Sequence, residues 1–315
     1  MISRWMAMLL LLFLVNTLPF GIFMSEQKSR LPEVERLIEQ EEYEQAVILL
    51  NQVTGNGPVI DVETDYYYSV CYNRLGMPTA AAGYADLFLK HRNDDKGVYE
   101  KAVAGYGMGN YEEALTLFKQ IETVFEKKTE FCSYYGNVHY YTGDYETAML
   151  WLEQAAQDSS EGEILNYLLY DCYYQTASYE QAIRRADIEL DGLDPEDEAY
   201  SYDREELLYY RGDFYYLNRQ YEEAIKDYQV LADEETYYKD EAYYLIARCY
   251  AGLEDDANTY KYLKMGVEYD SYYYEHYRED EAFLKFFESD YYQGQRESFE
   301  PDFETGLEPG TDMEF

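Results

Sequence analysis

The sequence predicts an all-α protein built from repeated helical hairpins. The first observation is a recurring Tyr-x-x-Ala pair, which begins at five tyrosines: Tyr43, Tyr111, Tyr145, Tyr179 and Tyr221. The second is the spacing, because the middle three of these tyrosines follow each other at intervals of 34 residues. The third is the content of 41 tyrosines, which favours a packed fold over a disordered chain. A fixed period of this size indicates stacked copies of one unit.

The stretch from Phe131 to Ala155 shows this unit most clearly. Its second half carries Tyr145, Ala148 and Leu152 at spacings of three and four residues, which places them on one face of a helix. Its first half surrounds the small Gly136 with aromatic and apolar residues, and a Gly-Asp break separates the two halves. We therefore expect two antiparallel helices joined by a tight turn, which need neighbouring copies to bury their apolar faces.

Two degenerate copies raise the number of repeats to seven. One has Pro78 and Ala81 in the Tyr and Ala positions, and the last has Asp256 and Thr259 there. The step from the fifth to the sixth copy is 42 residues, eight more than one period. We place this excess in residues 196–203, where it lengthens a loop between repeats or the helix that follows.

Further positions repeat in the same register. Small residues lie nine positions before the Tyr position, at Ala102, Gly136, Gly212 and Ala247. Apolar or aromatic residues lie four positions after the Ala position, at Leu50, Phe118, Leu152, Tyr228 and Leu263. Glycines expected in the turns between paired helices are Gly76, Gly109 and Gly143.

With these positions the sequence resembles the tetratricopeptide repeat family across residues 27–271. The resemblance implies a right-handed superhelical solenoid of about seven helix-turn-helix repeats, with a groove lined mainly by the first helix of each repeat. Tyr170 departs from the pattern by filling a small-residue position, and Ala85 and Ala186 fill large-residue positions.

The N-terminal residues 1–26 contain an apolar run from Trp5 to Met24, whose length matches a bilayer core. Small residues of a cleavage site are missing at its end, so we expect an uncleaved membrane anchor. The alternatives are a removed signal sequence, a buried core helix or a soluble chain that starts at Met24. We expect the repeat domain outside the cytoplasm, and the alternative places it on the cytoplasmic face because basic residues follow the apolar run.

Two short regions follow the repeats. Residues 272–292 hold phenylalanine and leucine among charges and are expected to form a capping helix over the last repeat. Residues 293–315 combine proline and glycine with seven acidic residues against one arginine. We interpret them as a disordered acidic tail.

The charge balance limits the classes of partner. Asp and Glu outnumber Lys and Arg by 64 to 25. This excess argues against nucleic acid or an anionic lipid surface as the main partner, because both require basic side chains. A basic partner is easier to accommodate, and the alternative is a solvated, self-repelling surface without a charge-selective role.

Residues that could carry chemistry are sparse. The histidines His91, His139 and His276 are far apart, and no motif places a base beside a nucleophile. Three of the four cysteines, Cys71, Cys172 and Cys249, occupy equivalent repeat positions, so with Cys132 they are expected to be free and buried. We therefore predict no catalytic residue, no metal site, no cofactor and no enzymatic activity.

Tyrosines and polar residues recur on the first helices where the family's groove is expected. Twelve residues before the Tyr position lie Tyr66, Tyr99, Tyr167, Tyr209 and Tyr244. Tyrosines five residues before it, and polar residues eight before it, complete the predicted binding groove with Tyr106, Tyr140, Tyr174, Tyr216, Asn137, Asp171 and Asp213. Tyrosines offer rigid contact area and ring faces that attract cations. The alternative is that these rings mainly pack helices together.

The resulting hypothesis is a membrane-anchored protein-interaction scaffold. It would hold an extended, basic or aromatic-containing segment of a protein or peptide partner in the tyrosine-rich acidic groove. A secreted or anchored protein that binds or processes glycans is the alternative, since paired carboxylates could serve there. A cytoplasmic peptide sensor is a third class, although no output domain fits before Leu31.

Overall fold

The structure is a computed structural model that describes residues 30–55, 62–157, 162–197, 199–233, 236–269 and 277–295. The chain divides into two compact units, Met1–Leu169 and Tyr170–Phe315, with the boundary inside one helix. The described residues are helices and connecting turns, without a β-strand among them. The predicted all-α class is confirmed.

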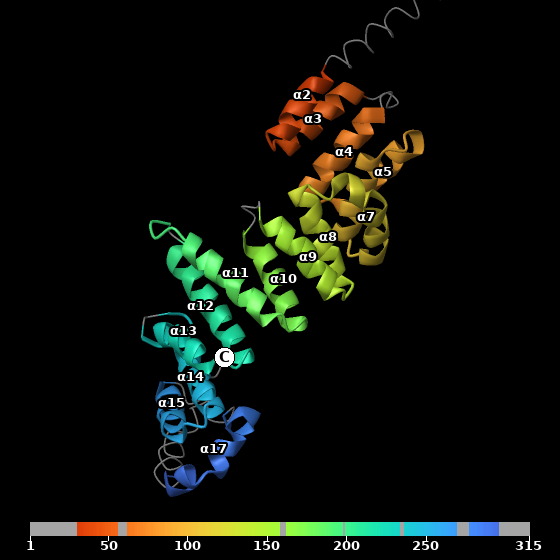
Figure 1. Cartoon of the computed structure of the whole chain (residues 1–315). Helices are drawn as coiled ribbons and strands as arrows, with labels where there is room; N and C mark the ends of the chain where they lie inside the picture. Colours follow the sequence, from red (N-terminus) through yellow and green to blue (C-terminus); the bar gives the residue numbers. More distant parts are fainter. Residues whose placement is uncertain are drawn as a thin grey trace, which may run out of the picture. The chain divides into compact units, whose positions relative to one another are not determined.

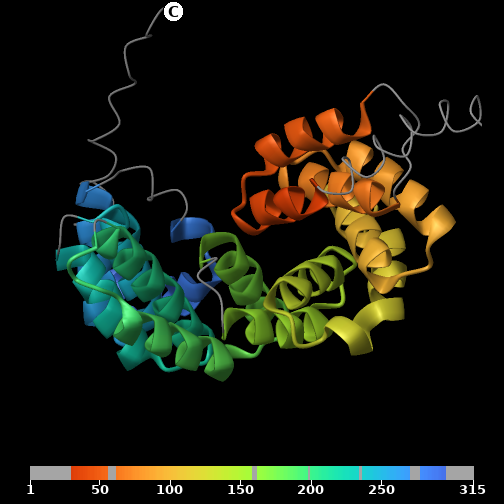
Figure 2. The same ribbon diagram turned by 90° about the horizontal axis from the view of Figure 1, so that it is seen from above.

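The helices follow one another as seven consecutive pairs in the described ranges, shown in Figures 1 and 2. The first unit holds α2 (Leu31–Glu39) and α3 (Tyr43–Thr54), α4 (Val62–Arg74) and α5 (Pro78–His91), α6 (Asp95–Gly107) and α7 (Tyr111–Phe125), and α8 (Thr129–Tyr141) and α9 (Tyr145–Ala156). The helix α10 (Gly162–Gln175) contains the boundary, and its partner is α11 (Tyr179–Gly192). The pairs α12 (Tyr200–Leu217) with α13 (Tyr221–Asp233), and α14 (Lys239–Gly252) with α15 (Asp256–Tyr269), complete the array.

Each second helix begins at the residue that the repeat register assigns to the Tyr position. Three residues further on, the small side chain in every copy is completely buried, at Ala46, Ala81, Ala114, Ala148, Ala182, Ala224 and Thr259. The facing first helices approach closely at their own small residues. A Cβ placed on Gly136 would lie 2.8 Å from the Leu152 side chain and 3.1 Å from its backbone nitrogen. The helices therefore pack at a distance that a larger residue at this position would not permit.

The turn inside each pair requires a left-handed backbone residue two positions before the second helix. Gly76, Gly109 and Gly143 adopt it, with φ of 67°, 76° and 81°. In the other four pairs the same position is not glycine, and Glu41, Ala177, Arg219 and Glu254 have φ between 54° and 60°. A side chain in this conformation costs roughly 1–2 kcal/mol, so helix packing determines these four turns against local preference.

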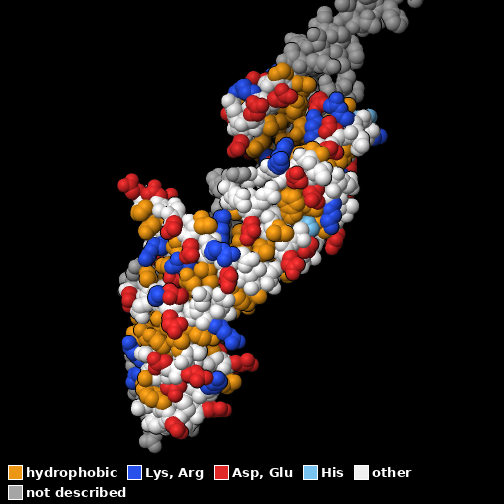
Figure 3. Space-filling view, viewed as in Figure 1, with side chains coloured by type: hydrophobic (Ala, Val, Ile, Leu, Met, Phe, Trp, Pro, Cys, Tyr) orange, Lys and Arg blue, Asp and Glu red, His pale blue; other side chains and the backbone are white. Residues whose placement is uncertain are grey.

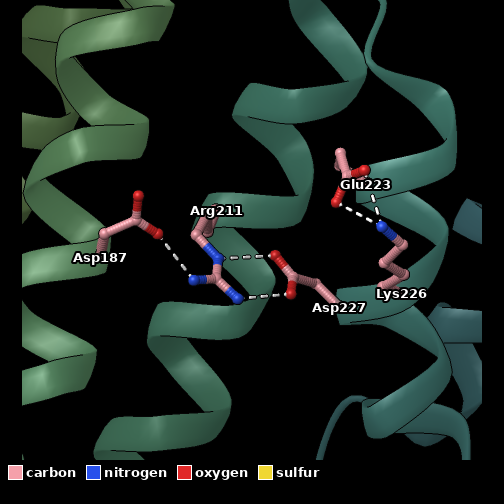
Figure 4. A network of polar contacts seen from close by, with 5 residues as sticks. All are labelled: Asp187, Arg211, Glu223, Lys226 and Asp227. Carbon is pink, nitrogen blue, oxygen red and sulfur yellow. Dashed lines mark hydrogen bonds and ion pairs between the residues drawn. The ribbon is translucent and has the colours of Figure 1, made fainter.

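An arginine in the second unit connects three successive helices (Figure 4). Arg211 on α12 donates two hydrogen bonds to Asp227 on α13, at 2.8 and 2.7 Å, and a third of 2.7 Å to Asp187 on α11. Asp227 is almost completely buried, whereas the Asp187 side chain remains 46% exposed. The forked guanidinium thus neutralises a carboxylate that water does not reach.

The C-terminal segment, residues 277–295, packs on the last repeat as expected of a cap. Tyr277, Phe283, Phe286 and Tyr292 join the buried core of α14 and α15. The segment is not one continuous helix, because a 3-10 turn (Glu281–Phe283) leads into the short α17 (Leu284–Glu288). Residues 272–276 of the predicted cap, and the tail from 296 onward, lie outside the described residues.

The predicted membrane-anchored location is corrected. Within the ranges that the structure describes, no helix combines the length and the apolar character needed to cross a bilayer. The apolar run from Trp5 to Met24, on which the prediction depended, lies outside those ranges.

Two glycines in helices test the close packing of the paired helices. Gly136→Ala should lower the free energy of unfolding by about 1–3 kcal/mol, because the added methyl group overlaps Leu152. Gly83→Ala is the matched control, since no atom lies within 4 Å of a Cβ at this exposed site. It should raise stability by about 0.5–1 kcal/mol through helix propensity. Urea denaturation measures both, and equal effects of the two substitutions would contradict the packing account.

A second pair of substitutions tests the arginine network. Arg211→Met leaves Asp227 buried without its cation and should destabilise the chain by about 3–5 kcal/mol. Asp187→Asn removes only the ion pair between Arg211 and the partly exposed Asp187. It should lower the free energy of unfolding by less than about 1 kcal/mol. Thermal and urea unfolding of the two variants provide the comparison. A larger loss for Asp187→Asn would show that the buried pair is not the dominant interaction.

Candidate functional site

The twelve predicted groove residues all lie on first helices, from α4 to α14, but their side chains differ in exposure. Tyr167 and Tyr174 on α10 are 60% and 55% exposed. Tyr99 and Asn137 are only 7% and 8% exposed, so their side chains offer little surface to a partner. The remaining eight are half-buried: Tyr66, Tyr106, Tyr140, Asp171, Tyr209, Asp213, Tyr216 and Tyr244.

The first unit carries a continuous cluster of partly exposed tyrosines. It is formed by Tyr134, Tyr106, Tyr111, Tyr141, Tyr140 and Tyr145, in order of ring contact, and is called the tyrosine cluster below. Successive ring centroids are 5.5, 5.9, 4.5, 5.2 and 5.5 Å apart. None of the six side chains is buried. Figure 3 shows side chains of the apolar class, which includes tyrosine, gathered over α8.

Local structure positions these rings. Tyr111 and Tyr145 are the first residues of α7 and α9, and Tyr141 is the last residue of α8. The tight turns bring these helix ends together, so that Tyr111 and Tyr141 stack with an interplanar angle of 10°. Asn137 supports the cluster by donating a 3.4 Å hydrogen bond to the Tyr106 hydroxyl. Burial raises the pKa of Tyr106 to about 12, so its hydroxyl stays protonated at neutral pH.

Sequence reasoning selected only Tyr106 and Tyr140 from the tyrosine cluster. Tyr111 and Tyr145 were recognised as repeat markers, and the regular spacing of these markers gave no indication of surface exposure. Tyr134 and Tyr141 do not lie at any of the repeat positions from which the groove was predicted, which are twelve, eight and five residues before the Tyr position. For Tyr141 the available signal was its position next to the turn between α8 and α9, whereas Tyr134, in the middle of α8, offered no such signal.

A buried polar group lies between the first helices of the same unit. Glu100 on α6 is 2% exposed and accepts a 2.7 Å hydrogen bond from Asn73 on α4. Arg74, the next residue on α4, is ion-paired with Glu130 on α8. Burial raises the pKa of Glu100 to about 7, and the nearby Arg74 only partly opposes this shift. The group joins three consecutive repeats, with Glu100 buried and Glu130 exposed.

In the second unit three of the predicted groove residues, Tyr209, Asp213 and Tyr244, are hydrogen-bonded to other parts of the unit. The Tyr209 hydroxyl donates to Glu241 at 3.1 Å, and the Tyr244 hydroxyl donates to Asp280. Asp213 accepts a 2.6 Å hydrogen bond from the buried Tyr228, and burial raises its pKa to about 6. These contacts hold helices of the second unit together. Tyr209 and Tyr244 therefore help to pack helices, which was the alternative to a binding role.

The reactive residue types have structural surroundings where they are described. All four cysteines are free and buried. His139 is 3% exposed, with Nδ1 lying 3.1 Å from Asp144, while His91 is exposed and His276 lies outside the described residues. The described part of the chain contains no group of three or more side chains placed to hold a metal ion. The arrangement offers surfaces for association.

Fold and surface define a protein of helical-hairpin repeats with an exposed tyrosine cluster on the third and fourth repeats. Residues 99–163 match the family model for the tetratricopeptide repeat, which agrees with the resemblance inferred from the period. The matched range includes most of α6 and all of α7, α8 and α9, and with them the whole tyrosine cluster. No curated protein sequence matches the chain.

Solved structures show the same fold at low identity. A chain in the structure of Naa15/Naa10 bound to HypK-THB is 12% identical with a TM-score of 0.59, over 91% of this chain and 43% of that chain. This protein therefore spans less than half the length of that chain. The apo form of RapI is 14% identical (TM-score 0.49, 89% and 84% covered), and apo NprR from B. thuringiensis is 15% identical (TM-score 0.45, 90% and 86% covered). Likeness at this level concerns the fold alone.

The buried carboxyl of Glu100 predicts a specific pH dependence. Its pKa is raised from 4.5 to about 7, so the folded state binds the proton more tightly than the unfolded chain. The contribution of the protonated Glu100 to the free energy of unfolding is largest below pH 4.5. It is lost as the pH rises to 7, a change of about 3 kcal/mol. Glu100→Gln, which stays neutral, should become progressively more stable than the wild type from pH 5 to pH 8. Urea unfolding across this range measures the difference, and a difference independent of pH would contradict the assignment.

Proposed function

We propose that the protein is an interaction scaffold that holds an extended segment of a partner protein against the tyrosine cluster. The observation that carries this proposal is the run of six tyrosine rings in mutual contact, all partly exposed, on two adjacent repeats of the first unit. Isolated exposed tyrosines are ordinary at protein surfaces, but a contiguous aromatic surface is typical of association sites. Tyrosine also loses little conformational entropy when it becomes a contact residue.

The chemistry of the cluster favours a segment with aromatic or basic side chains. Ring faces stack on aromatic groups and attract cations. Acidic residues also lie in the first turns of the two second helices that contribute rings, at Glu112, Glu113 and Glu146, and all three are exposed. These acidic side chains, in a protein with a formal net charge of −39, make the tyrosine cluster attract a basic segment and repel an acidic one. Binding should weaken with added salt, because the acidic side chains are exposed.

Two rings of the tyrosine cluster, neither of them buried, can be removed together. The double variant Tyr140→Ala, Tyr141→Ala deletes two adjacent rings, and Tyr237→Ala deletes an 82% exposed tyrosine outside the cluster as the control. The double variant should reduce partner affinity by about tenfold or more, because aromatic anchors dominate interface energies. Tyr237→Ala should bind like the wild type.

Crosslinking mass spectrometry first identifies a partner segment, and fluorescence anisotropy of that labelled segment at low and high salt then measures its affinity. Thermal melts establish that both variants are folded. Equal affinity of the wild type and the double variant would exclude the tyrosine cluster as the binding surface.

A further inference from the structure

Two tyrosines of the second unit, Tyr209 and Tyr244, each make the same pair of contacts with a later segment of the chain, and each set of contacts is called a joint below. The Tyr209 ring stacks on Tyr238 with centroids 4.6 Å apart, and its hydroxyl donates to Glu241. The Tyr244 ring stacks on Tyr277 at 4.9 Å, and its hydroxyl donates to Asp280. In both joints the aromatic residue and the acid that follows it are three positions apart. The residues between them differ, Lys239-Asp240 in one and Arg278-Glu279 in the other.

The shared sequence is a Tyr-x-x-acid motif, and its place relative to the helices differs between the two joints. Tyr238 is the residue before α14, and Glu241 lies in the first turn of that helix. Tyr277 lies in a helical stretch that ends at Glu279, and Asp280 is the N-cap of the following 3-10 turn and accepts a 2.8 Å hydrogen bond from the Ala282 backbone nitrogen. In both joints the spacing of three residues brings the two side chains to a single tyrosine. The C-terminal segment thus replaces the first helix of a further repeat.

The last joint contains an additional cation. Arg248 follows Tyr244 by four residues, and its guanidinium lies 4.6 Å from the Tyr216 ring centroid and 5.7 Å from that of Tyr244. Its Nε is 3.2 Å from an Asp280 carboxylate oxygen, and the Asp280 side chain is 14% exposed. At the earlier joint the corresponding residue is Asp213, whose pKa is raised by burial and also by the charge of Glu241. The face of α14 therefore attracts an acidic motif by charge, whereas the corresponding face of α12 does not.

We propose that Tyr216, Tyr244 and Arg248 form a docking site for a partner segment that carries tyrosine and, three residues later, aspartate or glutamate. The chain's own residues 277–283 occupy this site in the closed state. This site lies in the second unit, separate from the tyrosine cluster, and recognises the opposite charge.

The occupying segment is suited to exchange. Between residues 277 and 295 no described α-helical stretch exceeds six residues, and stretches this short have little stability of their own. Opening the segment would expose Tyr277, Phe283, Phe286 and Tyr292 but would leave the helical pairs folded, so it requires less free energy than global unfolding. Once it opens, a partner segment with the same motif meets a preformed aromatic and cationic surface. The intramolecular segment lowers the apparent affinity of that partner in proportion to the time it occupies the site.

The test uses the full-length chain and a fluorescent peptide with the sequence of residues 277–295 as probe. Substituting Tyr277→Ala and Asp280→Ala in the chain weakens the internal occupant and leaves the docking face intact. This opened chain should bind the wild-type peptide at least tenfold more tightly than the wild-type chain does. Adding Arg248→Ala to the opened chain should reverse the gain. A chain with Glu279→Ala, an exposed change outside the motif, should behave like the wild type.

Peptide variants give the reciprocal measurement. A peptide with Asp280→Ala should lose about tenfold in affinity for the opened chain, and one with Glu279→Ala should lose none. If the opened chain does not fold, the single variant Asp280→Asn takes its place, with an expected gain of twofold or more. Equal peptide binding by wild-type and opened chains, or equal binding of the two peptide variants, would overturn the proposal.

Discussion

The fold depends on one steric constraint: every helical pair must bury a small side chain at the fourth residue of its second helix. Six alanines and Thr259 occupy this position, and none of them has exposed surface. In two pairs a glycine on the first helix also permits the close approach, with Gly136 against Leu152 and Gly212 against Tyr228. From this contact follow the starts of the second helices and the tight turns before them. The turns are imposed even on Ala177 and Arg219, which do not favour a left-handed backbone.

Polar contacts between repeats add specificity to this apolar packing. Arg211 joins three helices of the second unit, and the group around Glu100 joins three first helices of the first unit. Both place a carboxyl group where water is scarce, so each contact stabilises the fold only while its partners remain in place. The tyrosines have two different roles in the two units. Tyr209, Tyr228 and Tyr244 in the second unit join helices through their hydroxyl groups, whereas the tyrosines of the tyrosine cluster present their rings at the surface.

The repeat period was sufficient to predict the fold because it reports packing within one pair of helices. The Tyr position marks the first residue of each second helix, and the buried alanine follows from it. Burial of individual groove residues was not predictable in the same way. Tyr99 and Tyr167 occupy equivalent repeat positions, yet one is 7% and the other 60% exposed. Their difference depends on neighbouring side chains, such as Phe125 stacked on Tyr99 at 5.2 Å, which the repeat register does not specify. The Tyr-x-x-acid motif was missed for the same reason, since its two contacts reach a tyrosine more than 25 residues away in the chain.

The central claim is that the tyrosines serve two separate roles, binding at the tyrosine cluster and helix packing in the second unit. Nitration of tyrosines, mapped by mass spectrometry with and without a bound partner segment, tests this claim most directly. In the free protein Tyr140 and Tyr141 should react, whereas Tyr209 and Tyr228 should not. In the complex the first two should be protected and the second two unchanged. Persistent nitration of Tyr140 and Tyr141 in the complex would contradict the account.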